Sequence, residues 1–195
     1  MSTEIPLSKL NRALLNADTT LKAIEGFQGA AFGLADGVIC ILGMIIGAAV
    51  ATWDLKIIFV AAITGGLADA LGNSIGFYLS ELSERGAQIN TVERGGNSSI
   101  HSIREVIMSG VFSFMATVFV LALLLIPFTL LDIAVALITA AVEGIIVLFV
   151  LGIYVGKLSS ESLVRTAMKY ALLGIVGAIF SYLVGDLLRI WLLSI

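Results

Sequence analysis

Residues 27–52 read FQGAAFGLADGVICILGMIIGAAVAT, a run of 26 residues with a single charged side chain, that of Asp36. A helix needs about 20 mostly apolar residues to cross the hydrocarbon core of a bilayer, which is about 30 Å thick. Such a run takes the helical form in lipid, because a helix satisfies its backbone hydrogen bonds internally. The stretch therefore predicts a transmembrane helix.

The rest of the chain repeats this pattern four times, in residues 54–80, 103–130, 132–156 and 164–193. The 195-residue chain is 59% hydrophobic and 13% charged, with a mean hydropathy of +1.08. A soluble domain carries about twice that charged fraction. We therefore expect an all-α polytopic membrane protein with one domain of five transmembrane helices, residues 27–195. Residues 81–102 are expected to form a long polar cytoplasmic loop.

Residues 1–26 have a different pattern. Their apolar residues recur at three- and four-residue spacing, with charged residues off that stripe; the apolar set is Leu7, Leu10, Leu14, Ala17, Leu21 and Ile24. This predicts an amphipathic helix on the cytoplasmic membrane surface, with packing against the cytoplasmic loop as the alternative. The segment lacks the continuous apolar core and small-residue cleavage site of a signal peptide.

The lysines and arginines are distributed unevenly between the two ends of the helices. Nine of the eleven flank the first span, the loop 81–102 and the connection between the fourth and fifth spans. Cytoplasmic loops are enriched in these cations, so we expect a cytoplasmic N-terminus and an outside C-terminus, in the cell membrane. The net charge of −3 gives no reason to expect a nucleic-acid partner. One cysteine, Cys40, is too few for a disulfide framework or a thiolate metal cluster.

Two carboxylates lie deep within the first two predicted spans. At the helical rise, Asp36 and Asp69 are about 14 and 17 Å from the cytoplasmic ends of their helices. Because these helices form a hairpin, the two acids are at nearly the same level. A carboxylate in hydrocarbon costs a few kcal/mol, so matched acids predict a cation site. Asn73 follows Asp69 by four residues on the same helix face. The alternative for each acid is a structural hydrogen bond to a neighbouring helix.

Glycines recur at three- and four-residue spacing on both of these helices. This pattern favours tight helix packing, with a direct role in lining an ion path as the alternative; the glycines are Gly29, Gly33, Gly37, Gly43, Gly47, Gly65, Gly66, Gly72 and Gly76.

Other charged residues have less specific interpretations. Glu143 is deep in the fourth span, where it is equally consistent with a second proton or ion station and with a structural partner. Asp186 and Arg189 are spaced for a local salt bridge. His101 is expected to be solvated in the polar loop. No metalloprotease-like histidine pair, nucleophile elbow or phosphate loop occurs in the sequence, so we do not expect an enzyme.

Three segments resemble the vacuolar iron transporter (VIT) family of iron and manganese transporters. The segment FGLADGVICILGMIIGA, residues 32–48, is similar to the family's first helix, with its F-G-L-x-D-G pattern. GFYLS, residues 76–80, resembles the G-E-Y-L-S that ends its second helix. LGIYVGKLSSESLVRTAMKYALLGIVGAIFSYLVGDLL, residues 151–188, resembles its final hairpin. The resemblance covers most of the chain in order.

The resemblance implies a homodimer, with a metal path between subunits formed largely by the first two helices, and exchange of a divalent metal for protons. By motif, Asp36 matches the family's pore aspartate and Tyr182 its tyrosine in the last helix. This sequence departs from the family at Asn73, where a methionine is usual, and at Phe77, where the motif has glutamate. Its cytoplasmic segment is also short, with few glutamates.

We therefore predict a homodimeric transporter of Fe²⁺ or Mn²⁺ that works by proton antiport out of the cytoplasm, without a tightly bound cofactor. Asp36, Asp69 and Asn73 would form an oxygen-rich metal site, and such ligands suit hard cations. Glu143 and Tyr182 are candidates for the pore or a proton relay. The cytoplasmic metal candidates are Glu81 and Glu84. The alternatives are a passive cation path without proton coupling and a membrane scaffold that transports nothing.

Overall fold

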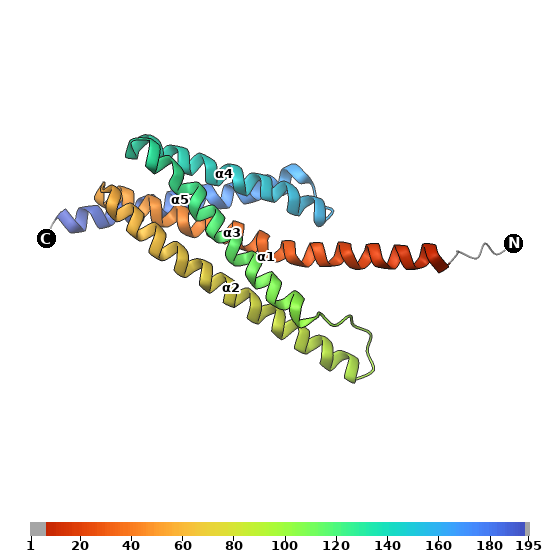
Figure 1. Ribbon diagram of the computed structural model, residues 1–195. Helices are drawn as coiled ribbons and strands as arrows, with labels where there is room; N and C mark the ends of the chain where they lie inside the picture. The colour runs from red at the N-terminus through yellow and green to blue at the C-terminus, as the bar shows by residue number, and fades with distance from the viewer. Residues whose placement is uncertain (1–6, 194–195) are drawn as a thin grey trace.

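The computed structural model describes residues 7–193, with side chains from Gln28 to Trp191, and consists of five α-helices (Figure 1). These are α1 (Leu7–Thr52), α2 (Leu55–Glu93), α3 (Ile103–Leu130), α4 (Ile133–Leu158) and α5 (Leu163–Leu193). Residues 7–193 contain no strand. Each helix includes a segment long and apolar enough to span a membrane. The predicted all-α fold with five spanning helices is confirmed.

Polar side chains mark where two of the helices begin. Trp53 adopts a left-handed conformation, φ 52°, in the short connection between α1 and α2. Asp54 then caps α2, because its carboxylate accepts a hydrogen bond from the backbone N–H of Lys56 at 2.7 Å. Ser102 and Glu105 form a reciprocal capping box at the start of α3. These caps satisfy N–H groups that the first helical turn leaves without a partner.

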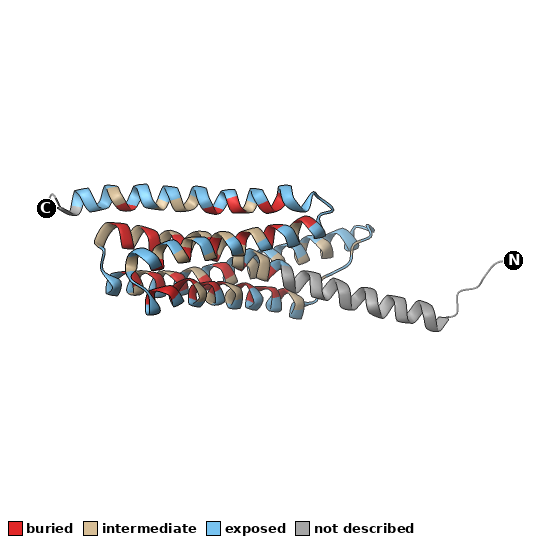
Figure 2. Ribbon diagram, turned by 90° about the horizontal axis from the view of Figure 1, so that it is seen from above, coloured by how far each residue is buried: buried red, intermediate tan, exposed pale blue. Residues whose placement is uncertain are grey.

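The helix α1 lies at the centre of the bundle and contacts all four others. It is the most buried of the five spans, and α5 is the least buried. In Figure 1, α2 and α4 lie on opposite sides of α1, and α3 crosses α1 from the end of α4 toward α2. Buried residues line the inner helix faces, whereas the outward faces are exposed (Figure 2). These exposed faces are rich in large apolar side chains, as expected for helices surrounded by lipid.

The contact between α1 and α3 is close because α1 has glycines where the helices meet. A Cβ atom at Gly33 would meet the backbone carbonyl oxygen of Ser113, and one at Gly29 would meet that of Ser109. The buried hydroxyl of Thr117 donates a hydrogen bond to the carbonyl oxygen of Gly33 at 3.1 Å. Here the glycines pack one helix against another, as the favoured sequence interpretation holds.

The segment expected as a polar loop, residues 81–102, is helical as far as Glu93. The extension consists largely of residues compatible with a helix, without proline, and it ends where Gly95 takes a positive φ of 82°. Polarity at residues 81–93 indicates contact with water, and an exposed helix satisfies that as well as a loop does. The loop prediction was therefore wrong for these residues and holds for 94–102.

The predicted amphipathic helix at residues 7–25 is part of α1, which continues without a break to Thr52. The side chains before Gln28 lie outside the described residues. Whether they form an apolar stripe on the membrane surface therefore stays a prediction.

Candidate metal centre

Side chains from α1 and α2 meet along one line of contact, turn by turn. Residues four apart lie on the same face of a helix, so each helix contributes positions spaced by four. We call this line the α1–α2 seam and define it by Phe32, Asp36, Cys40 and Met44 of α1 with Phe77, Asn73, Asp69 and Gly65 of α2.

The two ends of the seam are apolar. At the end nearer the loop 94–102, the rings of Phe32 and Phe77 lie with their centroids 5.5 Å apart. At the other end, the sulfur of Met44 lies against Gly65, where a Cβ atom would collide with it. The polar side chains of the seam therefore lie between an aromatic pair and a thioether.

In the middle of the seam lie Asp36, Cys40 and Asp69. Each aspartate offers one carboxylate oxygen, and Cys40 offers its thiol sulfur. These three atoms all lie within 4.8 Å of one another. Ligand atoms that share one ion at about 2.0–2.3 Å are at most about 4.6 Å apart. The three side chains are therefore close to a spacing at which a single ion could touch them all. Among the described residues, they form a group of acidic and sulfur ligands that could hold a metal ion.

Hydrogen bonds within the seam orient these groups. The thiol of Cys40 donates to Oδ1 of Asp36, with the sulfur and oxygen 3.7 Å apart. The amide Nδ2 of Asn73 donates to Oδ2 of Asp69 at 3.2 Å. The predicted contribution of Asn73 was its amide oxygen, but its amide nitrogen is what faces the carboxylate. In this arrangement Asn73 positions Asp69 instead of adding an oxygen to the group.

The three ligand candidates are half-buried, whereas Asn73 is buried. An ionised carboxylate within an apolar span is costly unless a cation or a hydrogen-bond donor compensates it. The thiol of Cys40 and the amide of Asn73 face the two aspartates as donors, and neither acid has an arginine or lysine partner among the described ion pairs. A mobile cation is a chemically suitable compensating charge.

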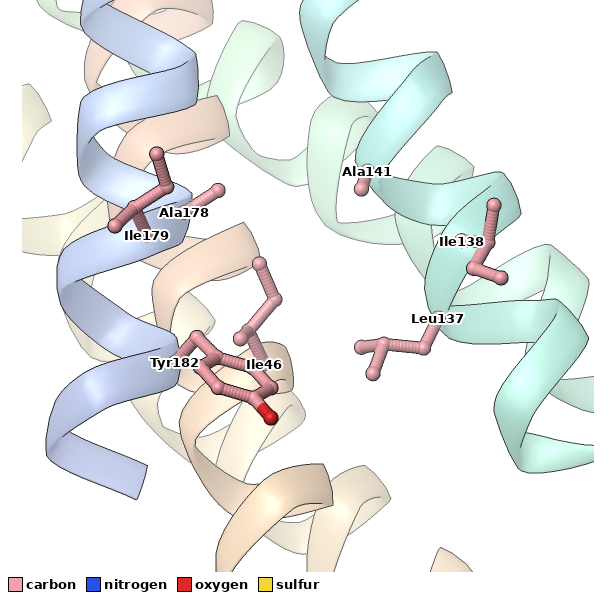
Figure 3. A pocket seen from close by; sticks show the side chains of 7 residues that line it. All are labelled: Ile46, Leu137, Ile138, Ala141, Ala178, Ile179 and Tyr182. Atoms are coloured by element: carbon pink, nitrogen blue, oxygen red, sulfur yellow. The ribbon is translucent and has the colours of Figure 1, made fainter. Parts of the chain in front are cut away.

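Tyr182, the predicted pore residue of α5, lies apart from this group. Its side chain lines an open apolar pocket of about 300 Å³ between α1, α4 and α5 (Figure 3). The pocket lining includes Ile46, which lies ten residues beyond Asp36 and so about 15 Å farther along α1. The structure therefore does not bring Tyr182 to the two aspartates.

Glu143 also lies outside the group, in α4. Its Oε2 atom is buried and accepts no hydrogen bond from any described group. The described residues thus supply no hydrogen-bond partner for this oxygen, and the role of Glu143 as a proton or ion station stays a prediction. Elsewhere in the spans, Arg189 donates to Asp186 at 2.6 Å, which confirms the predicted i,i+3 salt bridge.

The cytoplasmic candidates Glu81 and Glu84 have separate partners. Oε2 of Glu81 lies 3.4 Å from Nδ1 of His101, whose side chain is 18% exposed. Glu84 accepts a hydrogen bond from Gln88. Gln88 also accepts from the backbone N–H of His101, so the loop is tied back to α2. The prediction that His101 is solvated was wrong, because the helical extension of α2 gives the loop a surface to pack against.

Sequence reasoning missed Cys40 as a member of the central group. It treated the lone cysteine as evidence against a cluster of thiolates, which excludes only sites made of several cysteines. The signal was present in the spacing, because Cys40 follows Asp36 by four residues and so shares its helix face. The same spacing places Met44 one turn farther.

Comparison with known proteins gives two similarities. Residues 27–106 match the VIT family, and this region contains every residue of the α1–α2 seam. An uncharacterized protein of Methanocaldococcus jannaschii is 30% identical over 186 residues, which cover 90% of this chain and 97% of that protein. The second similarity extends well beyond the family match into the remaining helices.

Proposed function

The chain belongs to the VIT family of membrane metal-ion transporters, and on that premise we propose that it carries Fe²⁺ or Mn²⁺ out of the cytoplasm in exchange for protons. The observation that carries the proposal is the meeting of Asp36, Cys40 and Asp69 in the middle of two apolar helices. Their ligand atoms supply negative charge and a sulfur donor at a depth where a bound cation would offset the cost of burying the two carboxylates.

Proton exchange follows from the charge of the same group. While a divalent ion is bound, it compensates both carboxylates. Once the ion leaves, two like charges remain close together in a medium of low dielectric constant, and this favours uptake of a proton by one of them. Return of the metal then displaces the proton. Glu143 and Tyr182 are proposed as relay residues, because both are polar groups within the spans and outside the metal group.

We propose that the transporter is a two-fold homodimer with Asp36 of each subunit facing the axis. Two features support this. The metal group is half-buried within one chain, so one side of it remains open. On α2, moreover, a Cβ atom at Gly72 or Gly76 would have no described atom within 4 Å. Small residues with open space in front of them allow a second helix to approach closely in a membrane.

Uptake of Mn²⁺ and Fe²⁺ into proteoliposomes tests the proposal. We expect Asp36→Ala and Asp69→Asn to abolish uptake while the thermal unfolding temperature in detergent stays close to that of the wild type. Asp186→Asn is the matched control, because it removes a carboxylate that is paired with Arg189 away from the seam. Wild-type uptake by Asp36→Ala would remove the basis of the proposal.

The two rival functions make different predictions in the same system. A passive cation path would give fluxes that do not respond to a pH gradient across the liposome membrane, whereas antiport requires that response. A scaffold would bind no metal in the wild type, and the aspartate variants would lose folding or dimerisation instead of transport.

A further inference from the structure

We propose that Cys40 is a metal ligand and that its sulfur makes the site prefer Fe²⁺ over Mn²⁺ more strongly than a site made of oxygen ligands would. This inference rests on the proposed transport function and specifies its substrate. It adds a sulfur ligand to the predicted oxygen-rich site of Asp36, Asp69 and Asn73, in which the amide of Asn73 donates a hydrogen bond to Asp69.

The geometry places the sulfur in the ligand group and not beside it. Sγ of Cys40 lies within 4.8 Å of a carboxylate oxygen on each of the two aspartates, one from its own helix and one from α2. Its hydrogen bond to Asp36 is long, at 3.7 Å. An ion placed between the acids therefore lies within reach of the sulfur, and coordination would replace the thiol proton.

The neighbouring positions along the seam also support a sulfur ligand. The amide N–H of Asn73 donates to Asp69, so the third ligand atom beside the two carboxylate oxygens is the sulfur of Cys40. One turn beyond Cys40, Met44 directs a second sulfur toward α2, where Gly65 has no side chain to exclude it. The seam thus offers oxygen and sulfur in succession along one face of α1.

The ligand types indicate the class of metal. Carboxylate and water ligands suit Mg²⁺, Ca²⁺ and Mn²⁺, whereas thiolate ligands favour softer ions such as Zn²⁺, Cd²⁺ and Fe²⁺. Most sites bind Fe²⁺ more tightly than Mn²⁺ regardless of ligand, so a simple preference for iron would not identify the sulfur. The informative quantity is the change in that preference when sulfur is replaced by oxygen at the same position.

The first experiment measures Fe²⁺ and Mn²⁺ uptake under anaerobic conditions by wild-type protein and Cys40→Ser in proteoliposomes. We expect the ratio of iron to manganese uptake at subsaturating metal to fall by about tenfold in Cys40→Ser, mainly through weaker iron binding. Met115→Leu is the matched control, because it removes a sulfur from the exposed face of α3 and should leave the ratio unchanged. An unchanged ratio in Cys40→Ser overturns the proposal.

The second experiment uses the wild type, so it does not depend on how the variant folds. Cys40 is the one cysteine of the chain, so thiol reagents and thiolate absorption both report on this residue alone. We expect Cd²⁺ to produce a thiolate-to-metal charge-transfer band and to protect Cys40 from a maleimide. If Cd²⁺ blocks Mn²⁺ uptake without the band or the protection, the sulfur ligand is excluded while the transport function stands. If the wild type moves neither iron nor manganese, the transport function itself fails.

Discussion

Two glycine-containing stretches look alike in the sequence and have different surroundings in the structure. In α1, Gly29 and Gly33 are in contact with the backbone of α3, and no larger side chain would fit. In α2, Gly72 and Gly76 have open space in front of them within the described structure. The same spacing therefore serves internal packing in one helix and leaves an unoccupied face on the other.

This difference distinguishes the α1–α3 contact, which stabilises the fold, from the α1–α2 region, which remains open to its surroundings. The contact between α1 and α3 is closed and contains a buried interhelical hydrogen bond. The α1–α2 seam is half-buried and contains the metal group. Substitutions at the first contact should mainly affect stability, whereas substitutions around the second should mainly affect metal binding or association. Four measurements sharpen or break this distinction, and a fifth tests a polar contact outside both regions.

The largest effect is expected for Gly33→Ala. Its new methyl group would meet the carbonyl oxygen of Ser113, and backbone cannot move aside as a flexible side chain can. We expect a loss of about 3 kcal/mol or more in unfolding free energy, which exceeds the gain of about 1 kcal/mol from helix propensity. Gly86→Ala, where no described atom lies within 4 Å of the new Cβ, should show only the increase in unfolding free energy that comes from helix propensity. Equal stabilities of the two variants, measured by unfolding in detergent, would contradict the closed contact.

Gly72→Leu should act on association and not on the fold of the chain. A large side chain on the open face of α2 would hold a second copy away, at a cost of about 1–3 kcal/mol, which weakens the dimer by about 5-fold to 150-fold. The dimer dissociation constant can be measured by energy transfer between labelled subunits in liposomes. Ala134→Leu adds similar bulk to an exposed position of α4 and serves as the control. A dimer unaffected by Gly72→Leu would place the subunit boundary elsewhere.

Asn73→Ala tests the side of α2 that faces α1, next to Gly72. The substitution removes the donor that orients Asp69, and loss of such a supporting hydrogen bond typically costs about tenfold or more in metal affinity. Titration calorimetry with Mn²⁺ should show this loss with little change in unfolding temperature. Asn90→Ala, in the polar extension of α2, removes an amide bonded to its own helix and should leave affinity unchanged.

Thr117→Val measures the hydrogen bond across the closed contact. The hydroxyl of Thr117 donates to Gly33 from a fully buried position. Interhelical hydrogen bonds within membranes contribute about 0.6 kcal/mol on average, so we expect a loss of this size with metal uptake unchanged. Thr139→Val removes a hydroxyl that bonds within α4 and should cost less. A larger loss of uptake than of stability would mean that the closed contact also takes part in transport.

The smallest effect is expected in water, at the turn between α4 and α5. The hydroxyl of Thr166 and, secondarily, Lys169 hold the pKa of Glu161 below its ordinary value. Its ionised form therefore stabilises the folded chain above the unfolded pKa, and the contribution is lost as pH falls through the lowered folded pKa. Wild type and Glu161→Gln should differ slightly in unfolding temperature at neutral pH and converge in acid. A difference that persists in acid would exclude the ionised carboxylate as its cause.

Much of the fold was predictable, because the hydropathy of each span depends on the bilayer and not on contacts between helices. The close approach of Asp36 and Asp69 also followed from local information, namely their equal depth in a hairpin. The helix at residues 81–93 was not predicted, because polar composition distinguishes water from lipid and does not distinguish helix from loop.

The remaining details depend on how the helices are rotated about their axes. The spacing of Gly33 and of Gly72 is the same kind of pattern, and only the position of α3 determines which one is packed. Tyr182 matches a family motif, yet its side chain lines a pocket away from the aspartates. Cys40 was underestimated for a chemical reason, because one sulfur was judged by the requirements of an all-thiolate site.

The unbroken length of α2 gives it the mechanics of a lever. From Leu55, the helix extends about 21 Å to Asp69 and about 57 Å to Glu93. A rigid tilt about Leu55 would therefore displace the far tip about 2.7 times as much as the carboxylate. A spectroscopic label at that tip would report sub-ångström shifts of Asp69 in amplified form, from a position accessible to water.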